Sequence, residues 1–203
     1  MNLGRLQGLI ALHPPFRHAT PADARALTDL VHFASEGLAL HMWTKVAGPG
    51  GNPWEVGRER ARRETGSFSY RNAVVAEDGG RIAAGLIGYP LPDRPEPIPE
   101  GMPAMFVPLQ ELENLAPGTW YVNVLAAYPE DRGKGYGTAL LAIAEELASD
   151  TGRRGLSIIV SDANEGARRL YERRGYREIA RRRKVKEDWD GPGTHWVLLV
   201  KQA

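Results

Sequence analysis

The sequence predicts a single α/β domain built on a mixed sheet. Apolar runs of strand length alternate with amphipathic segments of helical spacing, and two neighbouring runs are joined by the tight-turn sequence Asp78-Gly79-Gly80. The C-terminal part of the chain reads as strand, helix, strand, helix, strand, which is the alternation of an α/β fold. A chain of 203 residues can enclose one sizeable core.

The first half of the chain contains three helical segments and three strands. Thr20 and Asp23 are residue types that favour a helix start, and the run 48–53, Gly-Pro-Gly-Gly-Asn-Pro, interrupts the helical pattern. The Asp-Gly-Gly turn at 78–80 favours an antiparallel hairpin. We expect a strand at 16–20, helices from Thr20 or Asp23 to Phe33, near 36–46 and at 54–64, and strands at 72–77 and 81–89.

The second half places a glycine-rich stretch between a strand and a helix. An apolar run at 120–127 precedes the glycines, and the segment 136–150 has apolar residues at helical spacing. Asp162 and Asn164 can cap a second helix, which Gly175 ends. We expect the remaining strands at 156–160, 177–186 and 195–201.

The glycine-rich stretch 132–137 reads Arg-Gly-Lys-Gly-Tyr-Gly and is the most informative part of the sequence. Its glycines let the backbone turn sharply and bring N–H groups close to a ligand. The following helix leaves its first N–H groups unpaired and carries a partial positive charge there, to which Arg132 and Lys134 add full charges. The stretch therefore predicts a pocket for a phosphate-bearing ligand.

Two other phosphate-binding motifs do not fit this stretch. A dinucleotide motif, Gly-x-Gly-x-x-Gly, would need glycine where the chain has Thr138, counting from Gly133, or Leu140, counting from Gly135. A P-loop would need Ser or Thr after Lys134, where the chain has Gly135.

The stretch resembles the acetyl-CoA signature of the GNAT acetyltransferase superfamily, Arg/Gln-x-x-Gly-x-Gly/Ala between a strand and a helix. Arg132, Gly135 and Gly137 fill this signature, and Pro129 stands at the usual place upstream. The stretch 164–176 resembles a second family pattern, Asn-x-x-Ala-x-x-Leu-Tyr-x-x-x-Gly-Phe/Tyr. Both stretches occur in the family's order and with its spacing.

The resemblance implies the GNAT fold, a mixed and mostly antiparallel sheet that is flanked by helices and splayed open between the strands at 120–127 and 156–161. It implies one domain over 1–203 that binds acetyl-CoA as cosubstrate. In the family, the strand before the loop binds the pantetheine arm, a backbone N–H there faces the thioester oxygen, and the loop binds the pyrophosphate. The implied cofactor-binding residues are Val124, Leu125, Ala126, Ala127, Arg132, Gly133, Lys134, Gly135, Tyr136, Gly137, Thr138, Asn164 and Tyr171.

The implied reaction is direct attack by a primary amine of a small molecule or peptide on the acetyl thioester. Tyr171 is the implied catalytic residue, because the family gives the tyrosine of its Leu-Tyr pair the task of protonating the departing thiolate. No general base is assigned, since the central-strand positions that carry one in some relatives are Tyr121 and Asn123. The candidates for the general base are a water chain or one of six side chains, Glu36, Glu77, Glu111, His18, His32 and His41.

Two segments fall outside the family pattern. Residues 1–15 form an N-terminal extension, and 89–118 form an insertion with eight of the fifteen prolines. The insertion also carries Met102, Met105 and Phe106, which a disordered linker would lack. We interpret it as a lid over the substrate or a contact in a homodimer. Together with 33–66, it is the region expected to select the acceptor.

Composition limits the other functions. The chain has no cysteine, which excludes disulfides, thiolate ligands and a cysteine nucleophile, and we expect no metal. No apolar stretch approaches the roughly 20 residues that cross a bilayer, so we expect a cytoplasmic protein that does not enter the membrane. Residues 6–12 are too short and interrupted for a signal peptide.

Charge is unevenly distributed although the net charge is only +1. The stretch 164–186 has ten Lys or Arg and three Asp or Glu, which leaves −6 for the rest of the chain and favours a cationic acceptor. A basic stretch raises nucleic-acid binding as an alternative, but stacking aromatics and a DNA-reading motif are missing, so we expect no nucleic-acid partner. A catalytically inactive CoA-binding sensor is the other alternative.

Overall fold

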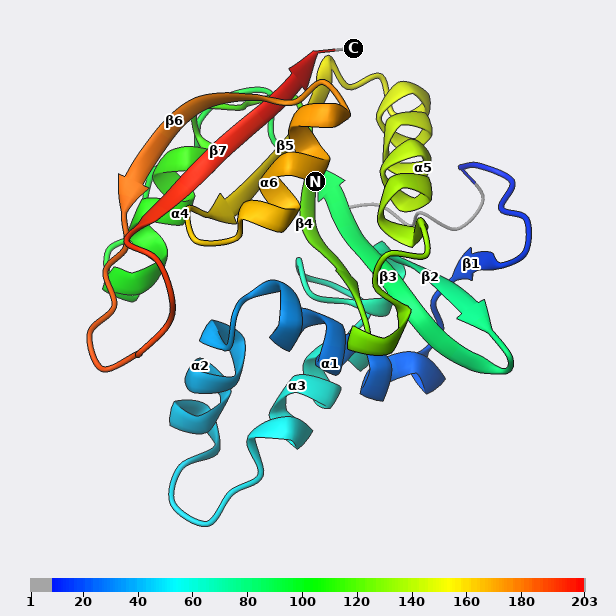
Figure 1. Ribbon diagram of the computed structural model, residues 1–203. Helices are drawn as coiled ribbons and strands as arrows, with labels where there is room; N and C mark the ends of the chain where they lie inside the picture. The colour runs from blue at the N-terminus through cyan, green and yellow to red at the C-terminus, as the bar shows by residue number, and fades with distance from the viewer. Residues whose placement is uncertain (1–8, 203) are drawn as a thin grey trace. The chain divides into compact units, whose positions relative to one another are not determined.

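The computed structural model describes residues 9–202 (Figure 1). The described chain forms two compact units, the first comprising residues 9–89 and 123–143 and the second residues 90–122 and 144–202. Strand β4 (Trp120–Ala127) and helix α5 (Tyr136–Asp150) each run from one unit into the other. Of the predicted N-terminal extension, 1–15, the structure describes residues 9–15, and residues 1–8 lie outside the described part.

Seven strands are hydrogen-bonded in the order β1-β2-β3-β4-β5-β7-β6. β4 and β5 pair in parallel, whereas β1–β2, β2–β3, β5–β7 and β6–β7 pair antiparallel. The predicted mixed and mostly antiparallel sheet is therefore confirmed. The other strands are β1 (Phe16–His18), β2 (Ala73–Asp78), β3 (Arg81–Pro90), β5 (Gly155–Ser161), β6 (Arg177–Arg183) and β7 (His195–Gln202).

The first unit contains the β2–β3 hairpin and three helices. Gly79 and Gly80 have φ angles of 58° and 77°, the left-handed geometry that a two-residue hairpin turn requires. Helix α1 packs against both α2 and α3. The bounds are α1 (Ala24–Ala34), α2 (Leu38–Ala47) and α3 (Pro53–Arg62), with a short 3₁₀ turn, η1 (Pro21–Asp23), before α1.

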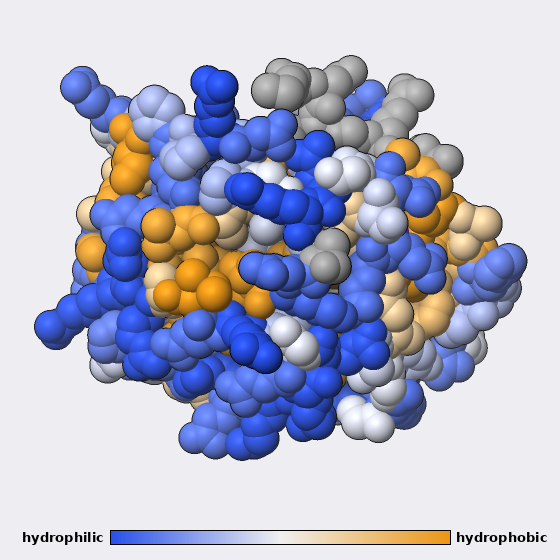
Figure 2. Space-filling model, turned by 90° about the horizontal axis from the view of Figure 1, so that it is seen from above, coloured by the Kyte–Doolittle hydropathy of each residue, from blue (hydrophilic) through white to orange (hydrophobic). Residues whose placement is uncertain are grey.

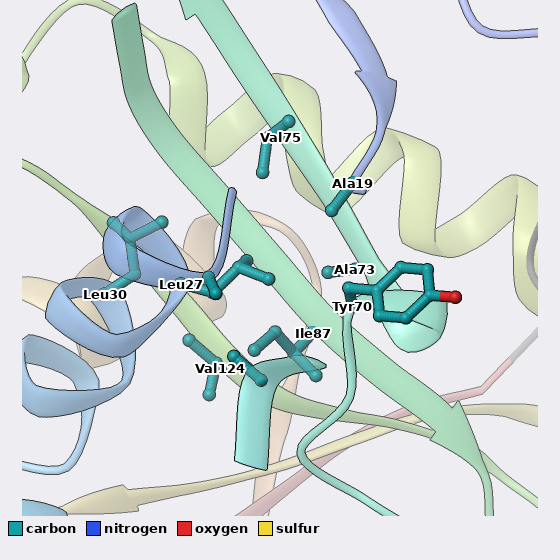
Figure 3. Close-up of a cluster of buried hydrophobic side chains, with 10 residues drawn as sticks. Ala19, Leu27, Leu30, Tyr70, Ala73, Val75, Ile87 and Val124 are labelled. Carbon is teal, nitrogen blue, oxygen red and sulfur yellow. The ribbon is translucent and has the colours of Figure 1, made fainter. Parts of the chain in front are cut away.

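One cluster of apolar side chains forms the core of this unit (Figure 3). Leu27 and Leu30 of α1 are fully buried against Ile87 of β3 and Val124 of β4. Each such side chain contributes about 1.5–3 kcal/mol when it is taken out of water. Because the Val124 side chain belongs to this core, only its backbone is left to contact a ligand.

Local chemistry sets the helix ends. Asn52 caps α3, since its Oδ1 accepts a 3.0 Å hydrogen bond from a backbone N–H in the first turn, and Pro53 occupies the first helical position. Helix α2 begins two residues later than predicted. Glu36 and Gly37 have φ angles of 52° and 91°, and left-handed residues cannot belong to a right-handed helix.

The second unit is built around β5, β7 and β6 (Figure 1). Leu198 and Leu199 of β7 are fully buried, and Leu156 and Ile158 of β5 are 3% exposed. Strand β6 ends at Arg183, three residues earlier than predicted, although the amide of Lys184 still donates to the carbonyl of Thr194 at 2.8 Å. The unit also contains α6 (Glu165–Arg173).

The insertion 89–118 contains a helix that the sequence analysis missed. The 3₁₀ turn η3 (Ala104–Phe106) leads into α4 (Val107–Glu113), which packs against β5, β6 and β7. Met105 and Leu112 of the insertion are buried, whereas Ile98 and Leu115 are 37% and 48% exposed. Pro108 lies in the first turn of α4, where a missing N–H costs little. The lid and dimer-contact hypotheses stay predictions.

Hydrophilic residues cover most of the face in Figure 2, and apolar residues form smaller areas among them. The most exposed large apolar side chains of the described chain are Val46 and Ile179, each 59% exposed, and they come from different units. Within residues 9–202, no helix combines the length and the apolar character needed to cross a membrane.

Candidate functional site

The end of β4 leads into the glycine-rich stretch. The parallel ladder between β4 and β5 covers residues 120–122 of β4 and stops there, which confirms the predicted splay between these strands. From residue 123 to the end of β4, the backbone groups that face β5 are therefore not paired with that strand. Val124 is buried, whereas residues 125–127 are partly exposed.

The stretch 132–137 folds as a tight turn that opens α5. Gly133 and Gly135 have φ angles of 79° and 89°. The space beside both is open, since a Cβ built at either glycine meets no atom within 4 Å. Glycine is therefore needed at both positions because of the positive φ angle, and not because a side chain would clash with a neighbouring atom. Gly137 already lies within α5.

The first turn of α5 presents unpaired N–H groups. The amide of Ala139 donates to the carbonyl of Gly135 at 3.1 Å, which begins the helical hydrogen bonding. The amides of residues 136–138 precede it and have no partner within the helix. Residues 132–135 and Thr138 are exposed. The helix end adds partial positive charge, so this turn can bind a phosphate group.

Asp131, directly before the stretch, anchors the turn from below the surface. Its side chain is 0% exposed and accepts bonds of 2.5 and 2.8 Å from Arg81 of β3 and one of 2.7 Å from Lys134. Hydrogen bonds from Arg81 and then Lys134 lower the pKa of Asp131 to about 2. The sequence analysis did not identify Asp131 as part of the site. The three-residue spacing between Asp131 and Lys134 was the only local indication that the two side chains form an ion pair.

The β2–β3 hairpin holds the turn at a second point. The Tyr136 hydroxyl donates to Asp78 at 3.1 Å, and burial with this bond raises the pKa of Tyr136. Lys134, predicted to offer its charge to phosphates, has its ammonium bound to Asp131. The side chain of Arg132 is exposed. The phosphate contacts of both cations stay predictions.

The residues of the second motif lie in the second unit. Asn164 caps α6 as predicted, since its Oδ1 accepts a 3.2 Å bond from the amide of Ala167, whereas Asp162 instead accepts from Thr194. Tyr171 is 4% exposed, and burial raises its pKa well above the usual range. The phenol therefore stays protonated at neutral pH, as its predicted role requires.

The basic stretch 164–186 is extensively ion-paired. Arg174 donates to Glu145 at 2.8 Å, and Arg182 donates to Glu111 at 2.7 Å. Further arginines of the stretch in ion pairs are Arg168, Arg169 and Arg181. Nucleic-acid binding depends on cations that are free to neutralise phosphates, so these pairs weaken that alternative.

Two of the carboxylates that are candidates for the general base are bound by arginines. Glu77 accepts a 2.7 Å bond from Arg17, and Glu111 accepts one from Arg182. Both carboxylates are therefore already held by an arginine. Burial lowers the pKa of His18, which is therefore neutral at pH 7. No base is assigned.

A second polar cluster, also missed by sequence reasoning, lies at the β6–β7 loop. Lys184 is 6% exposed, and its Nζ donates 2.7 Å bonds to Ser161 Oγ and to the carbonyl of Pro192. The same ammonium lies 4.0 Å from the ring centroid of Trp196, on which the indole of Trp189 stacks. These contacts fix the shape of the loop.

Comparison with protein-family models matches residues 39–176 to the acetyltransferase (GNAT) family, a range that contains both motifs. Similar solved structures include an acetyltransferase with 21% identity, 92% of this chain and 98% of that chain covered, and a TM-score of 0.62. Another is the N-acetyltransferase from Staphylococcus aureus Mu50, with 18% identity, 92% and 99% covered, and a TM-score of 0.60. A third is the ribosomal-protein-alanine N-acetyltransferase from Brucella melitensis, with 22% identity, 93% and 99% covered, and a TM-score of 0.59. Comparison with curated proteins finds no match.

Proposed function

Because this chain belongs to the acetyltransferase (GNAT) family, we propose that it transfers the acetyl group of acetyl-CoA to a primary amine of a small molecule or peptide. The observation that carries the proposal is the turn at 132–138, where two left-handed glycines precede the unpaired amides of α5. Such a turn suits the pyrophosphate of a CoA thioester.

The proposed reaction is direct acyl transfer. The amine nitrogen attacks the thioester carbonyl carbon, and a backbone N–H near Leu125 stabilises the oxygen as it gains negative charge. The carbon–sulfur bond then breaks, the amine nitrogen loses its extra proton to water, and the thiolate of CoA receives a proton from Tyr171. The Tyr171 phenolate recovers a proton from solvent before the next turnover. The place of Tyr171 in the Leu-Tyr pair of the second motif supports this role, and the buried phenol is protonated before the reaction.

The acceptor is proposed to be cationic in its resting state. Outside 164–186 the chain carries a net charge of −6, which attracts cations. An alkyl amine of pKa about 10.4 is neutral in about one molecule in 2,500 at pH 7, so its deprotonation must offset about 4.6 kcal/mol. Turnover is therefore expected to increase with pH.

An acetyl-CoA turnover screen tests this function. The full-length protein is incubated with acetyl-CoA and amines that include polyamines, amino acids, aminoglycosides and peptides, and free CoA thiol is measured together with the mass of the product. An acceptor-dependent release of CoA with a matching acetylated product is expected. CoA binding without turnover on any amine would favour the sensor alternative, and neither binding nor turnover would contradict the proposal.

A further inference from the structure

Asp131 lies directly before the Arg132–Gly137 signature, and its carboxylate links the signature to the β2–β3 hairpin. Its buried carboxylate accepts hydrogen bonds from the two terminal guanidinium nitrogens of Arg81, on the β2–β3 hairpin, and from the ammonium of Lys134, in the turn. The side chains of Arg81 and Lys134 are each 48% exposed, whereas the Asp131 carboxylate that binds them is buried. Both cations are therefore accessible at the surface beside the turn and are held there from the protein interior.

The charges around the turn balance. The cations are Arg81, Arg132 and Lys134, and the carboxylates that neighbour them are Asp78, Glu130 and Asp131. With three charges of each sign, the side chains around the turn carry no net charge that would attract an anion from a distance. Binding of a phosphate here must depend on where the cations and the backbone amides are held.

We propose that Asp131 is a positioning residue, which holds Lys134 and Arg81 in place so that the phosphates of a CoA thioester meet a preformed turn. This inference rests on the proposed function. Without the carboxylate, two long side chains and the turn between them would have to be ordered when the ligand binds, and that ordering costs affinity.

Replacement of Asp131 by Asn separates positioning from simple electrostatics, because the two effects have opposite signs. If Asp131 acted only through its charge, Asp131→Asn would remove a repulsion toward the phosphates and tighten CoA binding. If Asp131 positions the cations, the variant binds CoA more weakly, by about tenfold, as expected for the loss of hydrogen bonds between charged groups. Added salt would abolish the first effect and leave most of the second.

A matched control exists in the same unit. Arg17 donates bonds of 2.8 and 2.9 Å to Asp23, whose side chain is 9% exposed, so this is also a two-bond Arg–Asp pair. Asp23→Asn is expected to lower stability but to leave CoA affinity within about twofold of the wild type, because the pair lies outside the turn. Calorimetric titration with CoA and urea unfolding are measured for both variants and the wild type.

A second readout needs no ligand. Hydrogen exchange of the amides at 132–138 is expected to be faster in the Asp131→Asn variant than in the wild type or the Asp23→Asn variant, because the turn is less firmly held. If Asp131→Asn does not fold, Arg81→Gln removes the two bonds that tie Asp131 to the β2–β3 hairpin and leaves the Lys134 bond in place. The same faster exchange is then expected.

The outcomes distinguish this inference from the proposed function. Equal or tighter CoA binding by Asp131→Asn, with unchanged exchange at 132–138, would overturn the positioning role and leave the acetyltransferase proposal standing. A wild-type protein that binds no CoA would overturn the proposed function, and with it the phosphate contact inferred here. Faster exchange in the variant would then still show that Asp131 holds the turn.

Discussion

Gly135 offers the sharpest test of the turn. Its φ angle is 89°, and a Cβ at this position meets no atom within 4 Å, so Gly135→Ala introduces backbone strain without a clash. A left-handed alanine costs about 1–2 kcal/mol. If the turn relaxes in the free variant and must return to this geometry when it binds CoA, the dissociation constant increases by about 5- to 30-fold.

The control for this prediction is Gly66→Ala. Gly66 has a φ angle of 91° and the same open surroundings, so the strain is equal, but it lies outside the turn. Calorimetric titration with CoA and urea unfolding compare the two variants. CoA affinity should fall only in Gly135→Ala. Wild-type affinity in that variant, or an equal loss in Gly66→Ala, would refute the reasoning.

Three other predictions concern catalysis, the β6–β7 loop and pH. Tyr171→Phe should lower kcat by about tenfold or more, and an unchanged rate of the chemical step in single-turnover kinetics would contradict the role of Tyr171 as proton donor. Lys184→Met should lower the free energy of unfolding by about 1–3 kcal/mol in urea, because it removes the ammonium that donates to the buried Ser161 hydroxyl and to the carbonyl of Pro192; a fully stable variant would contradict this. Burial raises the pKa of Glu113 to about 7, so its contribution to stability is present below the ordinary carboxyl pKa and lost as pH rises toward 7. Glu113→Gln should therefore be more stable than the wild type at pH 8 and equal to it near pH 4, as measured by urea unfolding at each pH.

The parts of the fold that depend on local sequence were predictable. The turn residues Gly79 and Gly80 specify the hairpin, and β4 and α5 lie at the predicted boundaries, because their apolar spacing is regular and glycines mark their ends. Helix α4 was missed because its segment contains eight prolines, although Pro108, the one within the helix, lies in its first turn and is compatible with it.

The glycine turn was predictable in the same way, but its support was not. Arg81 lies 50 residues from Asp131 in the sequence, and only the tertiary fold brings the β2–β3 hairpin to the turn. Lys184 likewise reads as one more cation of a basic stretch, and its burial against Trp196 depends on how the β6–β7 loop closes. Spacing along the chain can show which backbone binds a ligand, but it does not show which distant side chains hold that backbone in place.

The most direct test of the account is an NMR titration of the wild-type protein with CoA, followed through its backbone amides. The account predicts saturable shifts of the amides of residues 133–138, larger than those of the matched turn around Gly66. CoA binding that leaves the amides of 133–138 unchanged, or no binding at all, would contradict it.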